Sequence, residues 1–481
     1  MPSSGILLHI ISLPGPYGIG DFGPNAYKFI DYLKTESHKY WQILPLSHCG
    51  YGNSPYNPIS AFAIDPHFVS PELLSEAGLV EPGDLLKATQ NNGDRVSYAK
   101  VQITKSQLWS KALAKYQKLR ASRSILSELD PALIPYVCFR YLSDRFKSTA
   151  WYNWPEEYRR YSQDIFDKIL LKDSDQITSI IGQQQILQDQ YKQLKDYANH
   201  NQISIIGDMP LYLSYDSAEL WAYQDIFKLD SSGKRISQAG VPPDAFSTDG
   251  QLWGNPIYRW DKMSRDGFSF FIERIDHAMQ LYDILRLDHF IGLVNYWEVP
   301  GDAENAIDGT WKEAMPEAFF TKLLSKYPVD RFIAEDLGIL NEKVCHYRDT
   351  NGFSGMIVLQ FCFEESVPEP QFYPPQCIIY AGTHDNKTSR QWFNELAPDS
   401  PSFLHLKGYY QKHPELGLGD TPTADNVALA IQKIALSSPC RIAIIPMQDV
   451  LNLGASARMN IPGTALGNWE WRMPDLPGST H

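Results

Sequence analysis

Long hydrophobic runs are absent from this 481-residue sequence. No stretch approaches the roughly 18 consecutive apolar residues that a membrane-spanning helix needs. Residues 1–18 contain no Lys or Arg, and Pro14 and Pro16 interrupt their short apolar run, so they do not resemble a signal peptide. We therefore expect neither a membrane partner nor export.

Positive charge is also scarce. The 43 Lys and Arg residues stand against 56 Asp and Glu residues, which gives a formal net charge of −13 and a pI near 5.4. Neutralising nucleic-acid phosphates requires a basic face, so this balance argues against DNA or RNA as a partner. The GxGxxG, P-loop and HExxH motifs are missing as well, and we expect no bound cofactor and no metal.

Cysteine is sparse, and its spacing is uninformative for binding. The six cysteines include no CxxC pair, which excludes both a disulfide framework and the common zinc sites. Widely scattered thiols are typical of a reducing compartment, so the predicted location is cytoplasmic. The six are Cys49, Cys138, Cys345, Cys362, Cys377 and Cys440.

Aromatic residues, in contrast, are plentiful. The chain has 12 Trp, 27 Tyr and 22 Phe residues, 13% of its length, within an overall hydrophobic content of 43% that is ordinary for a globular protein. Flat aromatic faces can stack on sugar rings, and they equally fill hydrophobic cores. The composition therefore allows a carbohydrate-binding protein without requiring one.

Eight short apolar runs recur along the chain, each bounded by turn residues and followed by a longer helical pattern. Continuous apolar strands are typical of a parallel sheet covered on both faces. Eight of them, alternating with helices, predict an α/β fold of the (β/α)8 TIM-barrel type, and an open doubly wound sheet is the alternative. The runs are Ile6–Ile10, Tyr40–Leu44, Ile203–Gly207, Ile284–Leu287, Arg331–Ala334, Met356–Phe361, Cys377–Ala381 and Arg441–Ile445.

The spacing of these runs predicts insertions into a single catalytic barrel that spans residues 1–481. The second and third strands are separated by far more chain than one helix needs, so residues 60–200 are interpreted as a mostly helical inserted subdomain. Ile180, Leu187 and Leu194 repeat every seven residues and predict a helix packed on a neighbour. A second insertion, residues 228–260, is dense in Gly, Pro and Asp and is interpreted as an active-site loop. The predicted helices of the subdomain are Val101–Leu119, Pro131–Phe146, Pro155–Leu171 and Gln176–Asn199.

Acidic residues follow four of the predicted strands. Asp208, Asp288, Glu335 and Asp385 each come at or just after the end of an apolar run. In a barrel the carboxyl ends of all strands meet at one rim, so these side chains should lie close together. A single Asp at such a position is often only the cap of the next helix, which is the alternative for each of them.

Two of these acids have sequence neighbours that predict opposite electrostatic environments. Arg286 and Asp288 share one face of a strand, and a guanidinium favours the ionised form of a nearby carboxylate. Glu335 ends an apolar strand beside Asp336, so desolvation and like charge should raise its pKa, as suits a general acid. Cleavage of a glycosidic bond requires such a pair. The alternative is that Arg286 and Asp288 form an ion pair that only holds the barrel together.

Polar and aromatic loop motifs accompany these acids. Ser54 and Tyr56 follow the second strand, while Asp244, Gln251 and Trp253 lie in the loop after the third. Rings for stacking mixed with hydrogen-bonding groups are typical of a sugar site, although Trp and Tyr in such loops also serve only to pin the loop.

At these residues the sequence resembles the 4-α-glucanotransferases, the amylomaltase or disproportionating-enzyme family of the α-amylase-like barrels. The resemblance extends almost from end to end of the chain, in order. Its segments are SPYNP (54–58), IGDMPLY (206–212), AGVPPDAFSTDGQLWGNPIY (239–258), RLDHFIGLVNYW (286–297), FIAEDLG (332–338), GTHDN (382–386) and ARMNIPGTALGNWEWR (457–472).

The resemblance implies a role for each matching residue. Asp288 would be the nucleophile, Glu335 the general acid and base, and Asp385 the third carboxylate of the donor site. The implied substrate-binding residues are Ser54, Tyr56, Asp208, Asp244, Gln251, Trp253, Arg286, His384 and, on the acceptor side, Asn460. Two positions depart from the family pattern, because Ala245 replaces the usual Tyr of PPDYF and Ile291 replaces an Arg that often follows DHF. The loss of the Tyr ring puts chain-length preference in question.

The implied reaction is a retaining transfer of α-1,4-glucan segments to the 4-hydroxyl of another glucan or of glucose. Retention predicts carboxyl groups of Asp288 and Glu335 about 5–5.5 Å apart. An α-1,4-glucan hydrolase with the same carboxylates and a silent glucan-binding protein are the alternatives. A metal-dependent barrel hydrolase, with His384, Asp385, His289 and Glu335 as ligands, would want an HxH pair on the first strand, which offers only His9.

Overall fold

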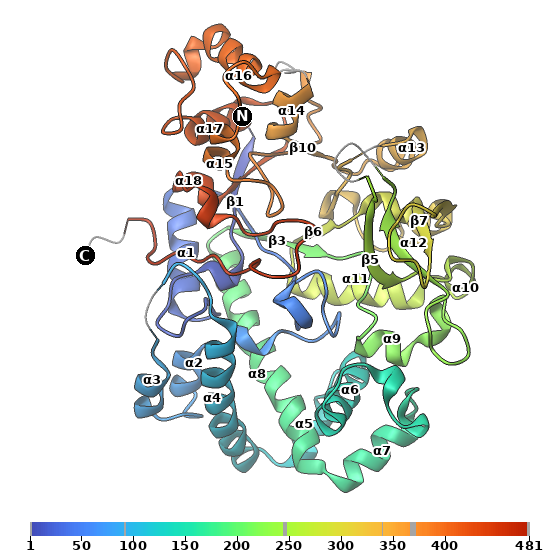
Figure 1. Cartoon of the computed structure of the whole chain (residues 1–481). Coiled ribbons are helices and arrows are strands. Elements are labelled where there is room, and N and C mark those ends of the chain that lie inside the picture. Colours follow the sequence, from blue (N-terminus) through green and yellow to red (C-terminus); the bar gives the residue numbers. More distant parts are fainter. Residues whose placement is uncertain (1, 91–92, 244–247, 339, 366–371, 479–481) are drawn as a thin grey trace.

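The centre of the molecule is a parallel sheet of eight strands (Figure 1). The computed structural model describes residues 2–90, 93–243, 248–338, 340–365 and 372–478. The strands pair in the order β10-β11-β12-β1-β2-β3-β6-β9. Each overlaps one of the eight predicted runs, although β1 begins three residues before its run and shares only Ile6 and Leu7 with it. They are β1 (Ser3–Leu7), β2 (Tyr40–Gln42), β3 (Ser204–Met209), β6 (Ile284–Leu287), β9 (Phe332–Ala334), β10 (Met356–Val358), β11 (Ile378–Tyr380) and β12 (Ile442–Pro446).

The sheet closes on itself where the segment before β10 meets β9. Ser354 forms a parallel bridge with Ile333, and its carbonyl accepts a hydrogen bond from Ala334 N at 2.8 Å. This contact joins the two ends of the strand order. The predicted (β/α)8 barrel is therefore confirmed.

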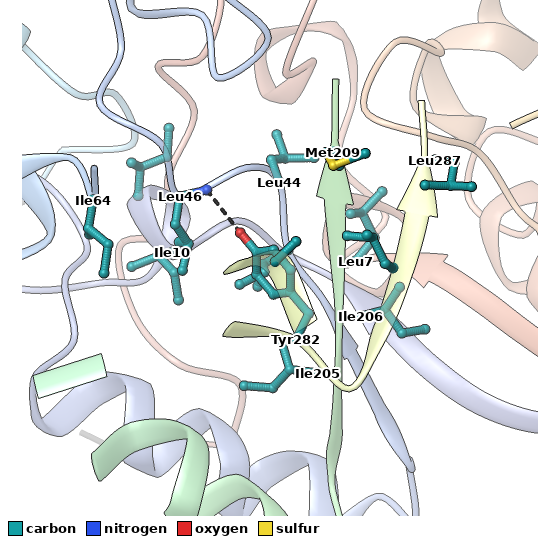
Figure 2. Packing of buried hydrophobic residues seen from close by; sticks show 14 of the residues in the cluster. Leu7, Ile10, Leu44, Leu46, Ile64, Ile205, Ile206, Met209, Tyr282 and Leu287 are labelled. Atoms are coloured by element: carbon teal, nitrogen blue, oxygen red, sulfur yellow. Dashed lines mark hydrogen bonds between the residues drawn. The ribbon is translucent and has the colours of Figure 1, made fainter. Parts of the chain in front are cut away.

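The barrel is surrounded by helices, and its strands are buried on both faces. Figure 2 shows part of the core, in which Tyr282 packs among aliphatic side chains beside β3. Gly207 in β3 makes this packing possible, because a Cβ there would lie 2.0 Å from the Tyr282 ring. No helix in the described ranges combines the length and apolarity needed to cross a membrane. The helices outside the β2–β3 insertion are α1 (Pro24–Thr35), α9 (Ala218–Ala222), α10 (Trp260–Arg265), α11 (Ser269–Leu281), α12 (Pro316–Leu324), α13 (Glu342–Asn351), α14 (Leu359–Glu365), α15 (Ser389–Asn394), α16 (Pro401–Lys412), α17 (Val427–Ser437) and α18 (Met447–Val450).

In the described part of the segment between β2 and β3 there are seven α-helices. The heptad residues Ile180, Leu187 and Leu194 are buried on the longest of them, α8, which packs against α4, α5 and α6. One predicted boundary was wrong, because the helix expected over Pro155–Leu171 begins only at α7. Its first part is held in turns by tertiary hydrogen bonds, including Trp221 Nε1 to the Tyr158 carbonyl at 2.8 Å. The seven are α2 (Pro71–Glu76), α3 (Pro82–Ala88), α4 (Tyr98–Leu119), α5 (Ser122–Ser127), α6 (Ile134–Phe146), α7 (Gln163–Lys172) and α8 (Ser174–His200).

A second, antiparallel sheet stands beside the barrel, and sequence analysis missed it. Its order is β5-β4-β7-β8, so the segment interpreted as an inserted loop, 228–260, contributes two paired strands. The Gly and Pro residues of β4 and β5 are atypical of strands, so the sequence did not indicate this pair. All four residues of β8 are exposed, so β8 lacks the alternation of apolar and polar residues that would identify a strand. The strands are β4 (Ser237–Val241), β5 (Gln251–Pro256), β7 (Asn295–Pro300) and β8 (Thr310–Glu313).

Candidate active site

The four predicted carboxylates lie at the carboxyl ends of barrel strands. Asp208 is near the end of β3, Asp288 follows β6, Glu335 follows β9, and Asp385 lies in the segment after β11. These ends share one rim, as the geometry of the fold requires. The alternative reading as helix caps is wrong for the helices that follow β3, β9 and β11, which are capped by Ser217, Asn341 and Thr388.

Arg286 connects two of the carboxylates. Its Nη1 donates to Asp208 Oδ2 at 2.7 Å and to Asp288 Oδ1 at 2.8 Å. The Asp208 side chain is fully buried, and burial raises its pKa to about 6 although Arg286 opposes this shift. The Asp288 side chain, by contrast, is 25% exposed. The Asp288 carboxyl group is therefore held by Arg286 at a place where a ligand can reach it.

Glu335 has a different environment. Burial raises its pKa to about 7, with the Asp288 charge adding to the shift and Arg286 opposing it. Backbone N–H groups of His289 and Leu337 donate to its carboxyl oxygens at 2.7 and 3.2 Å. The raised pKa that the sequence predicted is confirmed, but the neighbour responsible is not Asp336.

Asp336 is turned away from the rim. Its Oδ2 accepts from Arg348 Nη1 at 2.6 Å, and its Oδ1 accepts from Met356 N at 2.8 Å. These partners hold the side chain under the start of β10. The like charge beside Glu335 therefore comes from Asp288, across the rim rather than along the chain.

Asp385 is held by two side chains. His384 Nε2 lies 3.3 Å from Asp385 Oδ2, and Asn460 Nδ2 donates to Oδ1 at 2.6 Å. Burial alone would raise the pKa of Asp385, but these two partners keep it well below its usual range. Burial likewise opposes the charged form of His384, yet the Asp385 carboxylate raises the pKa of this imidazole. Asn460 thus contacts the third carboxylate directly.

Tyr56 connects His384 with Asp208, the carboxylate that Arg286 binds. Its hydroxyl donates to Asp208 Oδ2 at 2.8 Å, and its ring stacks on His384 with centroids 4.8 Å apart. Trp469 packs on the same two rings at 5.8 and 5.9 Å. Ser54, predicted to bind substrate, accepts from Tyr56 N at 3.3 Å and so shapes the turn that presents the tyrosine.

The loop residues Gln251 and Trp253 lie on β5 and are exposed. Trp253 Nε1 is 3.4 Å from Gln251 Oε1, and the Trp253 ring meets His289 edge to face with centroids 4.7 Å apart. An accessible indole therefore stands beside the residue that follows Asp288. Asp244, the remaining predicted loop residue, lies outside the described residues, as does Ala245.

Several residues of this site had no predicted part in glucan binding or catalysis. His289 adopts a left-handed conformation with φ 53°, which aims its N–H at Glu335. Arg458 Nη2 donates to the Asp385 carbonyl at 2.8 Å. Trp469 and Tyr212 supply further aromatic rings. The ring centroids of Tyr212 and His289 lie 6.2 Å apart. The motifs that contain these residues were recognised, but a bare motif does not reveal which member contacts which carboxylate.

The described residues do not support the alternative of a metal-dependent hydrolase. Nowhere in the part of the chain that the structure describes do three His, Cys, Asp or Glu side chains come together as a metal-binding group. His384 and Asp385 pair with each other, and His289 contributes its backbone rather than its ring to Glu335.

The barrel and its rim define a class of protein. Two carboxyl groups in opposed environments, with a third beside them and aromatic rings around the opening, are the equipment of barrel enzymes that act on glycosidic bonds. Within this class, residues 8–477 match the 4-alpha-glucanotransferase family. The chain belongs to that family, whose function is the transfer of glucan segments.

Its relatives cover nearly the whole chain. A 4-alpha-glucanotransferase of Aquifex aeolicus is 38% identical over 99% of this chain and 96% of its own length. The enzyme of Streptococcus pneumoniae serotype 4 is 37% identical over 98% and 93%. Among solved structures, the amylomaltase from Streptococcus agalactiae in complex with acarbose superposes with a TM-score of 0.92 at 35% identity, covering 98% of this chain and 95% of that one.

Proposed function

We propose that this chain transfers α-1,4-glucan segments by retaining double displacement, with Asp288 as nucleophile and Glu335 as acid and base. The observation that carries the proposal is the contrast between these two carboxyl groups. Arg286 Nη1 lies 2.8 Å from Asp288 Oδ1, while burial raises the pKa of Glu335 to about 7, so that a substantial fraction of Glu335 carries its proton at neutral pH. One group is therefore ready to attack and the other to protonate.

In the first step, the Asp288 carboxylate attacks the anomeric carbon as the glycosidic C–O bond breaks. Glu335 gives its proton to the departing oxygen, and the reducing-end fragment leaves. In the second step, the now ionised Glu335 takes the proton of an acceptor 4-hydroxyl. That oxygen attacks the same carbon, re-forms an α-1,4 bond and releases Asp288.

Asp385 and its partners form the proposed donor subsite. An ionised carboxylate fixed by His384 and Asn460 can accept hydrogen bonds from sugar hydroxyls. Asn460, which the family resemblance assigns to the acceptor side, is better explained here as a positioning residue for Asp385. Tyr56 offers a ring face beside the same subsite.

Transfer requires that a sugar reach the intermediate before water does. Trp253 is the proposed acceptor platform, because its exposed ring stands beside His289 at the rim. Other malto-oligosaccharides and glucose are the proposed acceptors. The predicted cytoplasmic location remains a proposal that rests on the scattered cysteines.

One product analysis tests the proposal. Purified protein incubated with maltotriose alone should yield glucose together with longer malto-oligosaccharides, without a net gain of reducing ends. Asp288→Asn should abolish both products, whereas Asp302→Asn, which changes an exposed acid outside the site, should change neither. Reducing ends that rise with each bond cleaved would indicate the hydrolase instead. Binding without products would indicate a silent glucan-binding protein.

A further inference from the structure

The C-terminal part of the site, residues 456–472, is bound to the helical insertion between β2 and β3. Val96 N, just before α4, donates to the Glu470 carbonyl at 2.6 Å. Arg95 forms an antiparallel bridge with Trp471. The chain that leads into α4, blue in Figure 1, is thus joined to the red C-terminal segment.

The side chain of Arg95 makes further contacts with this segment. Its Nε and Nη2 donate to Glu470 Oε2 at 3.1 and 2.7 Å. Its Nη1 donates to the Ser456 carbonyl at 3.4 Å, and its Nη2 also donates to the Gly467 carbonyl at 3.1 Å. Because a guanidinium carries several donors in one rigid plane, this single group can bind both ends of the stretch 456–467 at once.

The stretch 456–467 carries two side chains that bind Asp385. Asn460 Nδ2 donates to Asp385 Oδ1 at 2.6 Å. Arg458 Nη2 donates to the Asp385 carbonyl at 2.8 Å, and Arg458 Nε donates to the Asn460 carbonyl at 2.8 Å. The place of the third carboxylate therefore depends on where this stretch lies.

Trp469, which follows the stretch, is held from the same side. The Tyr98 hydroxyl, in the first turn of α4, donates to the Trp469 carbonyl at 2.6 Å. Trp469 has φ 60°, a left-handed conformation that is uncommon for any residue other than glycine. Its ring packs on Tyr56 and His384. The insertion thus also fixes the backbone that presents this ring to the site.

We propose that Arg95 is a positioning residue for the donor subsite, because it joins the helical insertion to both ends of the stretch 456–467 and so keeps Asn460 in place against Asp385. The Arg95 side chain is 43% exposed, and an exposed ion pair contributes little to the stability of a fold. Its loss should therefore release the stretch locally and leave the rest of the fold intact. A displacement of about 1 Å at a substrate-positioning group can cost up to about 10²-fold in rate.

Hydrogen exchange tests this connection without any measurement of activity. In Arg95→Met, the amides of residues 456–470 should exchange about 10-fold faster than in the unmodified chain, while those of the barrel strands keep their rates. Lys100→Met is the matched control, because it removes an exposed cation of α4 and should leave both rates unchanged. Glu470→Gln removes the charge of the partner and should accelerate exchange in the same residues, which provides the test if Arg95→Met fails to fold. Unchanged exchange of residues 456–470 in the folded variant would overturn the proposal.

Kinetics tests the effect on catalysis, which rests on the proposed function. Arg95→Met should lower kcat/KM for maltotriose disproportionation by about 10-fold, and Lys100→Met should leave it unchanged. In an Asn460→Ala background, Arg95→Met should cost less than about threefold, because the contact through which Arg95 acts is already gone. Losses that multiply in the double variant would overturn the positioning role. Absence of transfer by the unmodified chain would instead refute the proposed function and leave the exchange result standing.

Discussion

The raised pKa of Glu335 predicts how both activity and stability respond to Glu335→Gln. Folding moves the pKa of this carboxyl group from 4.5 to about 7. The folded state therefore binds more protons than the unfolded state in this interval, and stability is lost as pH rises through it. The shift corresponds to about 3 kcal/mol of unfolding free energy between pH 4.5 and pH 8.

Glutamine cannot ionise, so the variant escapes this loss. Its unfolding free energy relative to the unmodified chain should rise by about 3 kcal/mol from pH 4.5 to pH 8, as measured by urea denaturation at each pH. Over the same range the variant should have lost transfer activity by several orders of magnitude, since Gln can neither give nor take the proton. The expected combination is an inactive variant whose stability relative to the unmodified chain increases with pH.

The pH profile of the unmodified enzyme provides the second reading. Because protonated Glu335 is the required form in the first step, kcat/KM should fall above an apparent pKa of about 7. The reasoning would be refuted by a stability difference that does not change with pH, together with a kcat/KM that stays level to pH 9. A stability difference that does not change with pH would show that folding does not raise the pKa of Glu335, and a kcat/KM that stays level to pH 9 would show that activity does not depend on loss of its proton in that range.

Further substitutions test the remaining parts of the site. Asn460→Ala removes a 2.6 Å hydrogen bond to Asp385 and should lower kcat/KM by about 10- to 100-fold. Leu466→Ala, which alters an exposed side chain of the same segment, should cost far less; equal losses would argue against a positioning role for Asn460. Arg286→Met leaves two carboxylates without their cation and should reduce kcat by more than 10²-fold and lower the melting temperature; near-normal kcat would contradict the bridge. Trp253→Ala should raise the ratio of reducing ends to longer products, because water then competes better with the acceptor; an unchanged ratio would exclude Trp253 as the platform.

The barrel was predictable because its signal is local. Each strand is a short apolar run that can be recognised in the sequence. The acids that follow the strands can then be placed at one rim, because the carboxyl ends of all barrel strands meet there. The heptad of α8 was equally visible, since Ile180, Leu187 and Leu194 repeat on one helix face. Helix starts were harder, because tertiary hydrogen bonds rather than residue preference keep the segment before α7 in turns.

The contacts within the site depend on geometry that no local pattern records. Asp336 is the neighbour of Glu335 in sequence, yet Arg348 draws Asp336 away and the like charge beside Glu335 comes from Asp288. The left-handed backbone of His289 is likewise invisible in the letters RLDH, although it supplies the shortest hydrogen bond to Glu335. The sequence thus predicted that four acids share one rim, and the structure was needed to show which side chains contact each of them.

Trapping of the covalent intermediate tests the account most directly. A Glu335→Ala variant given an α-maltosyl fluoride donor, whose fluoride leaves without an acid, should form the glycosyl ester and then stall for lack of a base. Mass spectrometry of the digested protein should place a maltosyl group on the peptide that contains Asp288, and Asp288→Asn should abolish it. A maltosyl group on any other residue, or fluoride release with inversion at the anomeric carbon, would contradict the assignment.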